Sequence, residues 1–333
     1  MILRSVIIGA GRVGSRFDED GKRKTTWSHA GAYLAHPERF ALVGAAEPDE
    51  GNRAAFARRC PDVPIYADAR TLIAATAPDV ISICTPAEHH AAMLDAALSS
   101  PNVKAVWCEK PLAAGADEAE RMIARADERG IPVVVSYVRR WMPLWRRARE
   151  LIGQGAVGRL VSLRIAMPNR LHTIGSHQVD LALFLGGPAG TVRGLRIPAL
   201  EEGGEPAAAA LMALHFGAYA ILNVTGYRAD LAIEAEAFGT EGRMAVRENG
   251  GEIRIERFAP SAQYCDYREL GAARVERASG FAEMSPFEAI AHEIAELCAN
   301  PTLKPSCDAR DACNVQRILA VLAAAPIAST ARS

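Results

Sequence analysis

The feature that most constrains this chain is a strand-like run followed at once by a glycine-rich turn. Residues 2–8 are rich in β-branched side chains, and Gly9-Ala10-Gly11-Arg12-Val13-Gly14 follows directly. In this pattern the first glycine permits a tight turn, the second lets the backbone approach a diphosphate, and the third lets a helix pack on the strand. The diphosphate would lie at the helix N-terminus. These residues predict a dinucleotide-binding α/β domain.

Length and charge limit the class of protein. A chain of 333 residues is long for one hydrophobic core and predicts two domains. The formal net charge of -1 supplies no basic field, so we expect neither nucleic acid nor a membrane as partner. Seven cysteines without paired close spacing indicate neither a disulfide framework nor a zinc site, and no metal is expected. The expected location is a reducing cytoplasm.

The order of the predicted elements divides the chain near residue 137. Before it, strands expected at 40–46, 79–84, 104–108 and 131–137 alternate with helices at 29–34, 90–99 and 117–129. Alternation of this kind predicts a parallel, doubly wound sheet. After it come a helix ending at Gly153, mostly strands from 160 to 257 with one helix at 176–185, and helices at 286–299 and 308–324. We expect domains at 1–137 and 138–333, with the terminal helices able to pack back on the first domain.

One stretch approaches the length of a membrane span. Residues 206–224 are almost wholly apolar but contain His215, Gly217 and Asn223. Residues 216–218 resemble a tight turn between two strands, so we predict a hairpin. The N-terminus lacks the long apolar core and cleavage site of a signal peptide.

An acidic residue ends the second predicted strand. In a dinucleotide-binding domain, a carboxylate such as Glu47 accepts hydrogen bonds from the adenosine ribose and repels a 2′-phosphate, which favours NAD. Arg53 lies nearby and could serve a 2′-phosphate, so NADP is not excluded. The alternative for Glu47 is an acidic residue that only stabilises the N-terminus of the following helix. The polar segment 16–24 lengthens the usual separation between the glycines and this acid. We interpret the segment as a solvated insertion; covering a cofactor or substrate is the alternative.

Two further strands end in residues suited to a site. The strand at 104–108 ends in Glu109-Lys110 and is stopped by Pro111, which places Lys110 at the strand's carboxyl end, where ligands bind in such sheets. The alternative is a solvated surface lysine. Thr85-Pro86 and His90 follow the strand at 79–84. No ligand set accompanies the histidines, so a helix-capping and cofactor-lining role is expected in preference to a metal site.

Together these residues resemble the Gfo/Idh/MocA family, named for glucose-fructose oxidoreductase, inositol dehydrogenase and MocA. The glycine turn, the T-P-x-x-x-H element and E-K-P occur in the family's order. The later matches are Arg140-Trp141-Met142-Pro143, Gly155-Ala-Val-Gly158, Gly175-Ser-His-Gln-Val-Asp180 and Gly239-Thr-Glu-Gly242. The set covers nearly the whole chain.

The resemblance implies a Rossmann domain followed by an α+β domain whose open, mostly antiparallel sheet covers the nicotinamide. It also implies catalysis by Lys110 and a D-x-x-x-H pair, in which His177 is the histidine and Thr173 stands where the family has aspartate. Lys110 would polarise the substrate oxygen and His177 would exchange its proton. We expect substrate contacts from Tyr137, Arg140, Thr173 and Asp180. Surface packing is the alternative for Tyr137 and Arg140, and orientation of His177 is the alternative for Asp180. The expected cofactor-binding residues are Gly9, Ala10, Gly11, Arg12, Val13, Gly14, Glu47, Thr85, Pro86, His90, Glu109 and Lys110.

The function expected from this resemblance is transfer of hydride between NAD(H) and a hydroxyl or ketone carbon of a sugar, cyclitol or nucleotide sugar. Two alternatives stay open. Because threonine has no acid or base strength, the chain could instead be a nucleotide- or sugar-sensing relative with weak or no catalysis. Cleavage of a glycoside with NAD recycled in each turnover is the other. A homo-oligomer formed through the second domain's sheet is expected.

Overall fold

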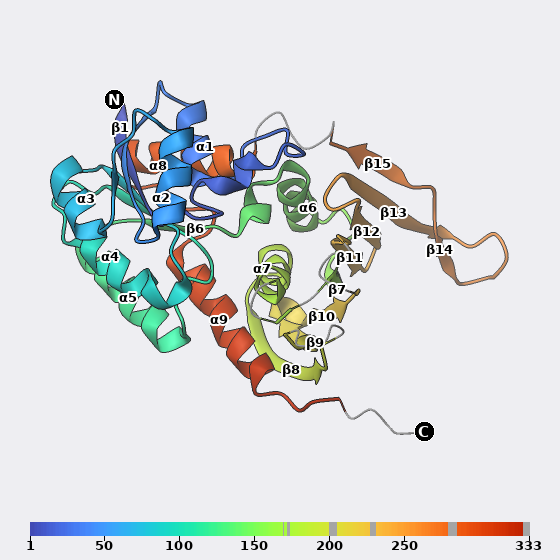
Figure 1. The fold of residues 1–333 in the computed structure, drawn as a ribbon. Helices are drawn as coiled ribbons and strands as arrows, with labels where there is room; N and C mark the ends of the chain where they lie inside the picture. The colour runs from blue at the N-terminus through green and yellow to red at the C-terminus, as the bar shows by residue number, and fades with distance from the viewer. Residues whose placement is uncertain (169, 172–173, 200–204, 227–230, 279–284, 329–333) are drawn as a thin grey trace. The chain divides into compact units, whose positions relative to one another are not determined.

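The computed structural model describes residues 1–168, 170–171, 174–199, 205–226, 231–278 and 285–328. The chain forms two compact units, which are described separately (Figure 1). Unit 1 contains Met1–Trp141 and the described residues of 283–314, and unit 2 contains the remainder. The structural boundary falls a few residues after the expected one, and the helix at 286–299 belongs to unit 1.

Unit 1 contains a six-stranded parallel sheet. Its strands are β1 (Leu3–Ile8), β2 (Phe40–Ala46), β3 (Ile65–Tyr66), β4 (Val80–Ile83), β5 (Ala105–Cys108) and β6 (Val133–Val135). They lie in the order β3-β2-β1-β4-β5-β6. Successive strands are therefore added on one side of β1 up to β3 and on its other side from β4 onward. The predicted doubly wound sheet is confirmed. Ligands bind such sheets at the carboxyl ends of the strands beside this switch point.

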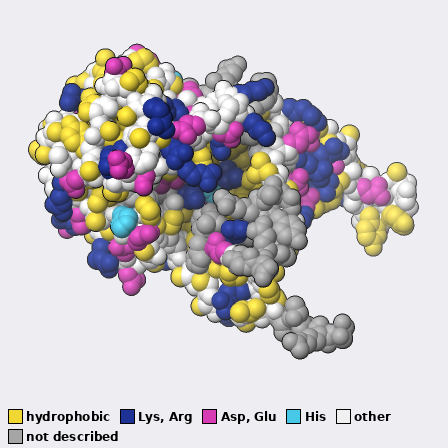
Figure 2. Space-filling view, in the orientation of Figure 1, with side chains coloured by type: hydrophobic (Ala, Val, Ile, Leu, Met, Phe, Trp, Pro, Cys, Tyr) yellow, Lys and Arg dark blue, Asp and Glu magenta, His cyan; other side chains and the backbone are white. Residues whose placement is uncertain are grey.

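Helices cover this sheet on both faces. They are α1 (His29–Ala35), α2 (Glu50–Arg59), α3 (Ala69–Thr76), α4 (His90–Leu98), α5 (Ala116–Arg129) and α8 (Pro286–Ala299). Helices α3, α4 and α5 pack in a row, and α1 packs on α8 (Figure 1). The largest buried side chains of this unit include Trp107, Tyr33 and Phe56. On the face seen in Figure 2, acidic and basic side chains are interspersed over unit 1.

The first helix of the dinucleotide fold is interrupted by an insertion. The carbonyls of Val13 and Gly14 accept hydrogen bonds from the N–H groups of His29 and Ala30, at 3.1 and 2.9 Å. Each bond spans twelve residues more than the i to i+4 bond of an α-helix. The chain therefore leaves the helix after the glycine turn, forms the inserted segment and then continues the same helix, in register, as α1.

The insertion is held by a carboxylate. Asp18 Oδ1 accepts from the Trp27 backbone N–H at 2.5 Å, and Oδ2 accepts from Ser28 Oγ at 2.5 Å and from Arg59 at 2.8 Å. Ser28 in turn caps α1 by accepting from the Gly31 N–H. The inserted segment is therefore not simply a solvated loop. The mostly buried Asp18 carboxylate lies in its first turn and accepts hydrogen bonds from residues at its end, just before α1.

Unit 2 is built on a nine-stranded sheet, mostly antiparallel. Its strands are β7 (Leu160–Met167), β8 (Ala189–Ile197), β9 (Ala207–Leu214), β10 (Tyr219–Val224), β11 (Glu234–Gly239), β12 (Gly242–Arg247), β13 (Glu252–Pro260), β14 (Arg268–Leu270) and β15 (Arg274–Arg277). The order is β14-β13-β12-β11-β7-β10-β9-β8, with β15 beside β13 and only β7 and β10 parallel among these pairs. Helices α6 (Pro143–Gly153) and α7 (Gly175–Gly186) pack on it. Helix α9 (Ala309–Ala323) begins in unit 1 and ends in unit 2. The expected α+β domain with an open sheet is confirmed.

Two of the sequence motifs prove to be structural. Gly158 has a φ of +76°, and an added Cβ would lie 2.5 Å from Thr240 Oγ1. A Cβ on Gly239 would lie 2.1 Å from the carbonyl oxygen of Val157. The two glycine turns pack against each other at the start of β7, which is why both need glycine.

The apolar stretch at 206–224 is the predicted hairpin. Strands β9 and β10 pair antiparallel, with Ile221 opposite Leu211, and a turn at His215–Gly217 joins them. In the part of the chain that the structure describes, no helix is both long and apolar enough to cross a membrane.

Replacing Asp18 with alanine should destabilise unit 1 by about 2 to 3 kcal/mol, since the substitution leaves Arg59 and the Trp27 N–H without their acceptor. Urea denaturation followed by circular dichroism measures the change. Asp20→Ala is the matched control, because Asp20 is 51% exposed and its ion pair with Arg23 is long at 3.6 Å. The control should cost less than about 0.5 kcal/mol. Equal effects of the two substitutions would contradict the anchoring role of Asp18.

Candidate functional site

The glycine turn at the carboxyl end of β1 has room for a ligand at one position. A Cβ on Gly9, whose φ is +96°, would lie 2.8 Å from the Cys84 carbonyl, and one on Gly14 would lie 2.0 Å from the Gly9 oxygen. At Gly11, by contrast, no neighbouring part of the described chain comes within 4 Å of such an atom. Crowded outer glycines around an open central one are what a bound diphosphate requires of this backbone. The residues present therefore fit a dinucleotide.

The remaining residues of the turn have distinct positions. Ala10 is fully buried, and the Val13 carbonyl is bonded across the insertion. The Arg12 guanidinium lies 5.0 Å from the centre of the Phe17 ring, and Arg23 lies 4.8 Å from the same ring. The insertion thus stacks an aromatic ring on the arginine of the turn.

Glu47 lies at the carboxyl end of β2, as predicted. Its side chain is nearly buried, and Oε1 accepts a hydrogen bond from the Asp49 backbone N–H at 3.0 Å. Arg53 donates to the carbonyl oxygens of Glu47 and Pro48, at 3.0 and 2.6 Å. These contacts orient the carboxylate and hold the arginine against the backbone.

The histidine of the T-P-x-x-x-H element joins two loops at this edge. His90 is 1% exposed, with Nε2 2.8 Å from the Thr85 carbonyl oxygen and Nδ1 3.2 Å from that of Leu112. It therefore ties the Thr85-Pro86 loop after β4 to the loop after β5. Thr85 Oγ1 is buried and has no partner among the described residues. Direct contact of His90 with a cofactor stays a prediction.

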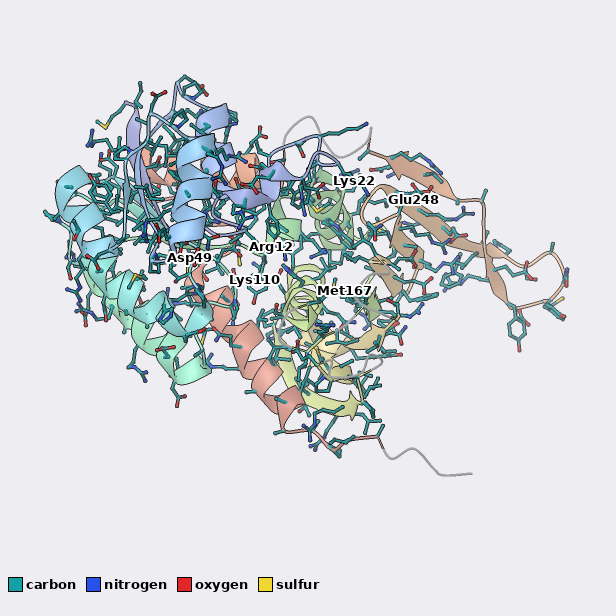
Figure 3. All side chains as sticks on the ribbon, in the orientation of Figure 1. Arg12, Lys22, Asp49, Lys110, Met167 and Glu248 are labelled. Atoms are coloured by element: carbon teal, nitrogen blue, oxygen red, sulfur yellow. The ribbon has the colours of Figure 1, made fainter. Side chains whose placement is uncertain are left out.

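Lys110 lies at the carboxyl edge of the sheet, two residues after β5, and its peptide bond to Pro111 is cis. Arg12, Asp49 and Lys110, labelled in Figure 3, follow β1, β2 and β5, and the carboxyl ends of these parallel strands lie along one edge of the sheet. The side chain is half-buried. Its position is the one expected from the sequence for a residue that faces a ligand at the switch point.

The carboxylate beside Lys110 is buried and hydrogen-bonded. Glu109 Oε1 lies 3.2 Å from His29 Nε2, and the backbone N–H of Lys110 donates to Oε2 at 3.3 Å. Burial raises the pKa of Glu109, but the hydrogen bond from His29, the charge of His29 once it is protonated at acidic pH, the charge of Lys110 and the effect of Ser136 outweigh it, and the net pKa is lowered. Burial also lowers the pKa of His29, against the opposing effect of Glu109. We therefore take the pair as a neutral imidazole and an ionised carboxylate.

Sequence reasoning did not assign a role to His29. It is fully buried on α1, with its ring centroid 3.7 Å from that of Trp107, and Nδ1 lies 3.0 Å from Ser82 Oγ. The available signal was the insertion itself, since removing twelve residues brings His29 to within one helical turn of Gly14.

The predicted residues of unit 2 lie on or before α7. His177 is half-buried in its first turn, and Asp180, one turn later, is 1% exposed. Gln178 between them donates to the carbonyl oxygens of Ile165 and Asn223, both at 2.9 Å, which fixes α7 on the sheet. Thr173 lies outside the described residues, so its predicted substrate contact and that of Asp180 stay predictions.

Tyr137 and Arg140 are both buried in unit 1. Tyr137 is fully buried. Arg140, 5% exposed, donates to Asp311 at 2.8 Å and to the Ser306 carbonyl oxygen at 2.9 Å. These bonds tie the R-W-x-P element to the chain before and within α9. Substrate contact by either residue stays a prediction.

Neither a metal nor a cysteine nucleophile is indicated at this edge. No group of three or more potential metal ligands occurs among the described residues. Cys108 is buried and Cys84 half-buried near Glu109, and desolvation followed by that negative charge raises the pKa of both thiols well above the ordinary value. Both therefore remain neutral thiols near neutral pH.

The strand order, the glycine turn and the acidic end of β2 define a dinucleotide-binding Rossmann domain. Residues 3–137 match the family model for an oxidoreductase family with an NAD-binding Rossmann fold, GFO_IDH_MocA. The predicted resemblance is confirmed: the chain carries the NAD-binding domain of the Gfo/Idh/MocA oxidoreductase family.

Three comparisons give the extent of the likeness. Inositol 2-dehydrogenase of Corynebacterium glutamicum (strain R) is 28% identical over 163 residues, which are 49% of this chain and 44% of that protein. The galactose/lactose metabolism regulatory protein GAL80 of Saccharomyces cerevisiae is 38% identical over 74 residues, 22% of this chain and 17% of that protein. A levoglucosan dehydrogenase in complex with NADH has a TM-score of 0.79 at 21% identity, covering 97% of this chain and 96% of that one.

These matches differ in what they establish. The match to the levoglucosan dehydrogenase structure shows the fold over nearly the whole chain. The sequence matches are shorter: this chain spans about half the length of the inositol 2-dehydrogenases it matches.

The stability of unit 1 should fall as the pH drops below about 6.5, partly because of His29. The pKa of His29 is lowered from 6.5 in the folded chain, so the unfolded chain binds the proton first and stability is complete only above that value. Glu109, whose pKa is lowered from 4.5, loses its contribution only at more acidic pH. His292 acts with the same sign as His29, because burial also lowers its pKa.

The melting temperature of His29→Gln should therefore depend less steeply on pH between about 6.5 and 4.5 than that of the wild type. Differential scanning fluorimetry across this interval measures the slope. His89→Gln, which replaces an exposed histidine of the same unit, is the control and should keep the wild-type slope. An unchanged slope for His29→Gln would refute the assignment of a neutral, buried imidazole.

Proposed function

We propose that this protein is an NAD(H)-dependent oxidoreductase that acts on a CH–OH or ketone carbon of a sugar, cyclitol or nucleotide sugar. The observation that carries the proposal is the position of Lys110 at the carboxyl edge of the sheet, on the edge that holds the glycine turn and Glu47. The names of its relatives, which include inositol 2-dehydrogenase and levoglucosan dehydrogenase, support a polyhydroxylated substrate.

In the proposed mechanism, the glycine turn and Glu47 would hold the dinucleotide at this edge, and its nicotinamide would supply or accept the hydride when bound. The Lys110 ammonium donates a hydrogen bond to the substrate oxygen and stabilises negative charge that develops there. His177 accepts the hydroxyl proton during oxidation and returns it during reduction. Asp180, three residues later on α7, is proposed to orient the imidazole or contact substrate hydroxyls. Lys110 and His177 belong to different units, so their pairing is part of the proposal.

We propose NAD(H) as the preferred cofactor. The Glu47 carboxylate is oriented at the end of β2, where it accepts from a ribose hydroxyl and repels a 2′-phosphate. Arg53, which could attract that phosphate, is hydrogen-bonded to two backbone carbonyls.

Replacing Glu47 with serine should raise the Kd for NADH about tenfold, since a charge-assisted hydrogen bond is lost. It should also reduce the preference for NADH over NADPH. Fluorescence titration of both nucleotides measures the two constants. Asp49→Asn is the matched control: it removes a neighbouring charge, keeps a side chain able to cap α2 and should leave the preference unchanged. Wild-type preference in Glu47→Ser would show that another group reads the ribose.

Replacing Lys110 with alanine should lower turnover at least about 100-fold while NADH still binds, because the lysine acts on the reacting oxygen. The assay follows NADH absorbance with myo-inositol, levoglucosan and other sugars as substrates and NAD as oxidant. Lys104→Ala is the control, since Lys104 is partly exposed and paired with Asp79 at 2.9 Å. Turnover that survives in Lys110→Ala would refute the mechanism.

We further propose that the protein is cytoplasmic and forms a homo-oligomer through the sheet of unit 2. Leu195, Leu211, Tyr219 and Ile221 are exposed on neighbouring strands, with Ile221 directly opposite Leu211. Side chains of this kind on one face are typical of a subunit contact. The seven cysteines, none of which forms a disulfide, are compatible with a reducing compartment.

A second candidate function is sensing of a nucleotide or sugar without catalysis. The similarity of 74 residues to the regulatory protein GAL80 favours it, as does Thr173 in place of the family's aspartate. NADH binding without turnover across the substrate panel would support this candidate over the enzyme.

A further inference from the structure

We propose that His29 is a positioning residue for Lys110, acting through a one-way chain of buried hydrogen bonds that ends on the Glu109 carboxylate. The inference rests on the proposed function, because it assigns a supporting group to the proposed catalytic lysine. It concerns unit 1 alone, and all of its members are described residues.

The chain begins at Tyr33 and passes through two further side chains. Tyr33 Oη lies 2.8 Å from Ser82 Oγ, which lies 3.0 Å from His29 Nδ1, and His29 Nε2 lies 3.2 Å from Glu109 Oε1. Tyr33 is 1% exposed, and both Ser82 and His29 are fully buried. Water therefore does not compete for these bonds, and each depends on its protein partner.

The ionised carboxylate fixes the direction of every bond. A carboxylate only accepts, so His29 Nε2 must carry the proton and donate. A neutral imidazole then has Nδ1 as an acceptor, which the Ser82 hydroxyl satisfies by donating. Ser82 Oγ in turn accepts from the Tyr33 hydroxyl. The opposite direction would leave His29 Nε2 and Glu109 as two acceptors facing each other, which is unfavourable in a buried site.

A second donor bonds the other oxygen of the same carboxylate. Trp107 Nε1 donates to Ser136 Oγ at 2.8 Å, and Ser136 helps to lower the pKa of Glu109. The backbone N–H of Lys110 donates to Oε2 at 3.3 Å. Glu109 is thus held by a donor to each carboxylate oxygen, His29 on α1 to Oε1 and the Lys110 N–H to Oε2.

The consequence for Lys110 follows from Coulomb attraction. The charge of Glu109 acts on the adjacent ammonium, so the orientation of the carboxylate biases the direction in which the lysine points. His29 does not touch the reacting atoms. It keeps the carboxylate in place, and a reacting group displaced by about 1 Å can lose about 100-fold in rate.

The experiment first determines the His29 tautomer, which needs no substitution. Long-range nitrogen NMR of labelled protein should show His29 protonated at Nε2 and unprotonated at Nδ1 at neutral pH. The resonance is assigned among the chain's eight histidines by its loss in His29→Gln. A ring protonated at Nδ1 alone, or at both nitrogens, would overturn the proposal.

Two substitutions of His29 then test the roles of its two ring nitrogens separately. Glutamine places an amide N–H near the position of Nε2 and keeps the donor to Glu109, whereas asparagine reaches only the position of Nδ1 and loses it. Reductive ¹³C-methylation labels the five lysines, and Lys110→Ala identifies the Lys110 resonance. His29→Asn should shift this resonance and His29→Gln should restore it toward the wild-type position. Near-ultraviolet circular dichroism checks folding, and Ser82→Ala breaks the same chain from its other end and should give a smaller shift.

With a turned-over substrate in hand, His29→Asn should lower kcat about 100-fold and leave the Kd for NADH unchanged, while His29→Gln retains most of kcat. An equal loss in both variants, or an unshifted Lys110 resonance in His29→Asn and Ser82→Ala, would overturn the positioning role. Absence of turnover in the wild type would instead refute the proposed function, and the two NMR measurements would still decide the role of His29.

Discussion

The arrangement of unit 1 depends on two backbone hydrogen bonds that close the first helix across its insertion. Because the carbonyls of Val13 and Gly14 are bonded to the N–H groups of His29 and Ala30, the helix resumes in the register it would have without the excursion. Any other register would rotate α1 by about 100° per residue about its axis, since a turn contains 3.6 residues. His29 would then face away from Ser82 and Glu109, and the polar chain behind Lys110 could not form.

The same closure explains a spacing that was irregular in the sequence. Glu47 follows Gly14 by 33 positions, and discounting the twelve inserted residues returns a separation close to the usual value of about 20. Without the insertion, the glycine turn and Glu47 are therefore separated along the chain as in an ordinary dinucleotide-binding domain. The insertion adds its own contacts, through Asp18 and the Phe17 ring on Arg12, without moving the strands.

The sequence predicted the fold closely where periodicity and breakers act locally. Strand β2 and helix α8 were predicted with their observed bounds. A continuous apolar run followed by Glu-Pro marks β2, and Pro286 followed by apolar residues at helical spacing marks α8. The edge residues Lys110 and Glu47 could also be predicted, since the carboxyl ends of parallel strands share one edge. The roles of His29, Ser82 and Tyr33 could not, because they depend on contacts across 49 to 80 positions that no local pattern encodes. For Arg140 the sequence motif indicated a ligand contact. The structure instead shows hydrogen bonds to Ser306 and Asp311, which lie more than 160 positions away and could not be identified from a local motif.

A buried carboxylate next to a proposed catalytic lysine destabilises the fold unless its oxygens accept hydrogen bonds. Taking an unpaired charge out of water costs several kcal/mol, and packing apolar groups in the same volume would often be as stable. Unit 1 instead surrounds Glu109 with donors from separate segments, and its two neighbouring thiols remain neutral. Stability alone does not require this arrangement, since aromatic and aliphatic side chains already fill the surrounding core. A fixed negative charge beside Lys110 does require it, and so the polar chain is better explained by the orientation of the lysine than by the stability of the fold.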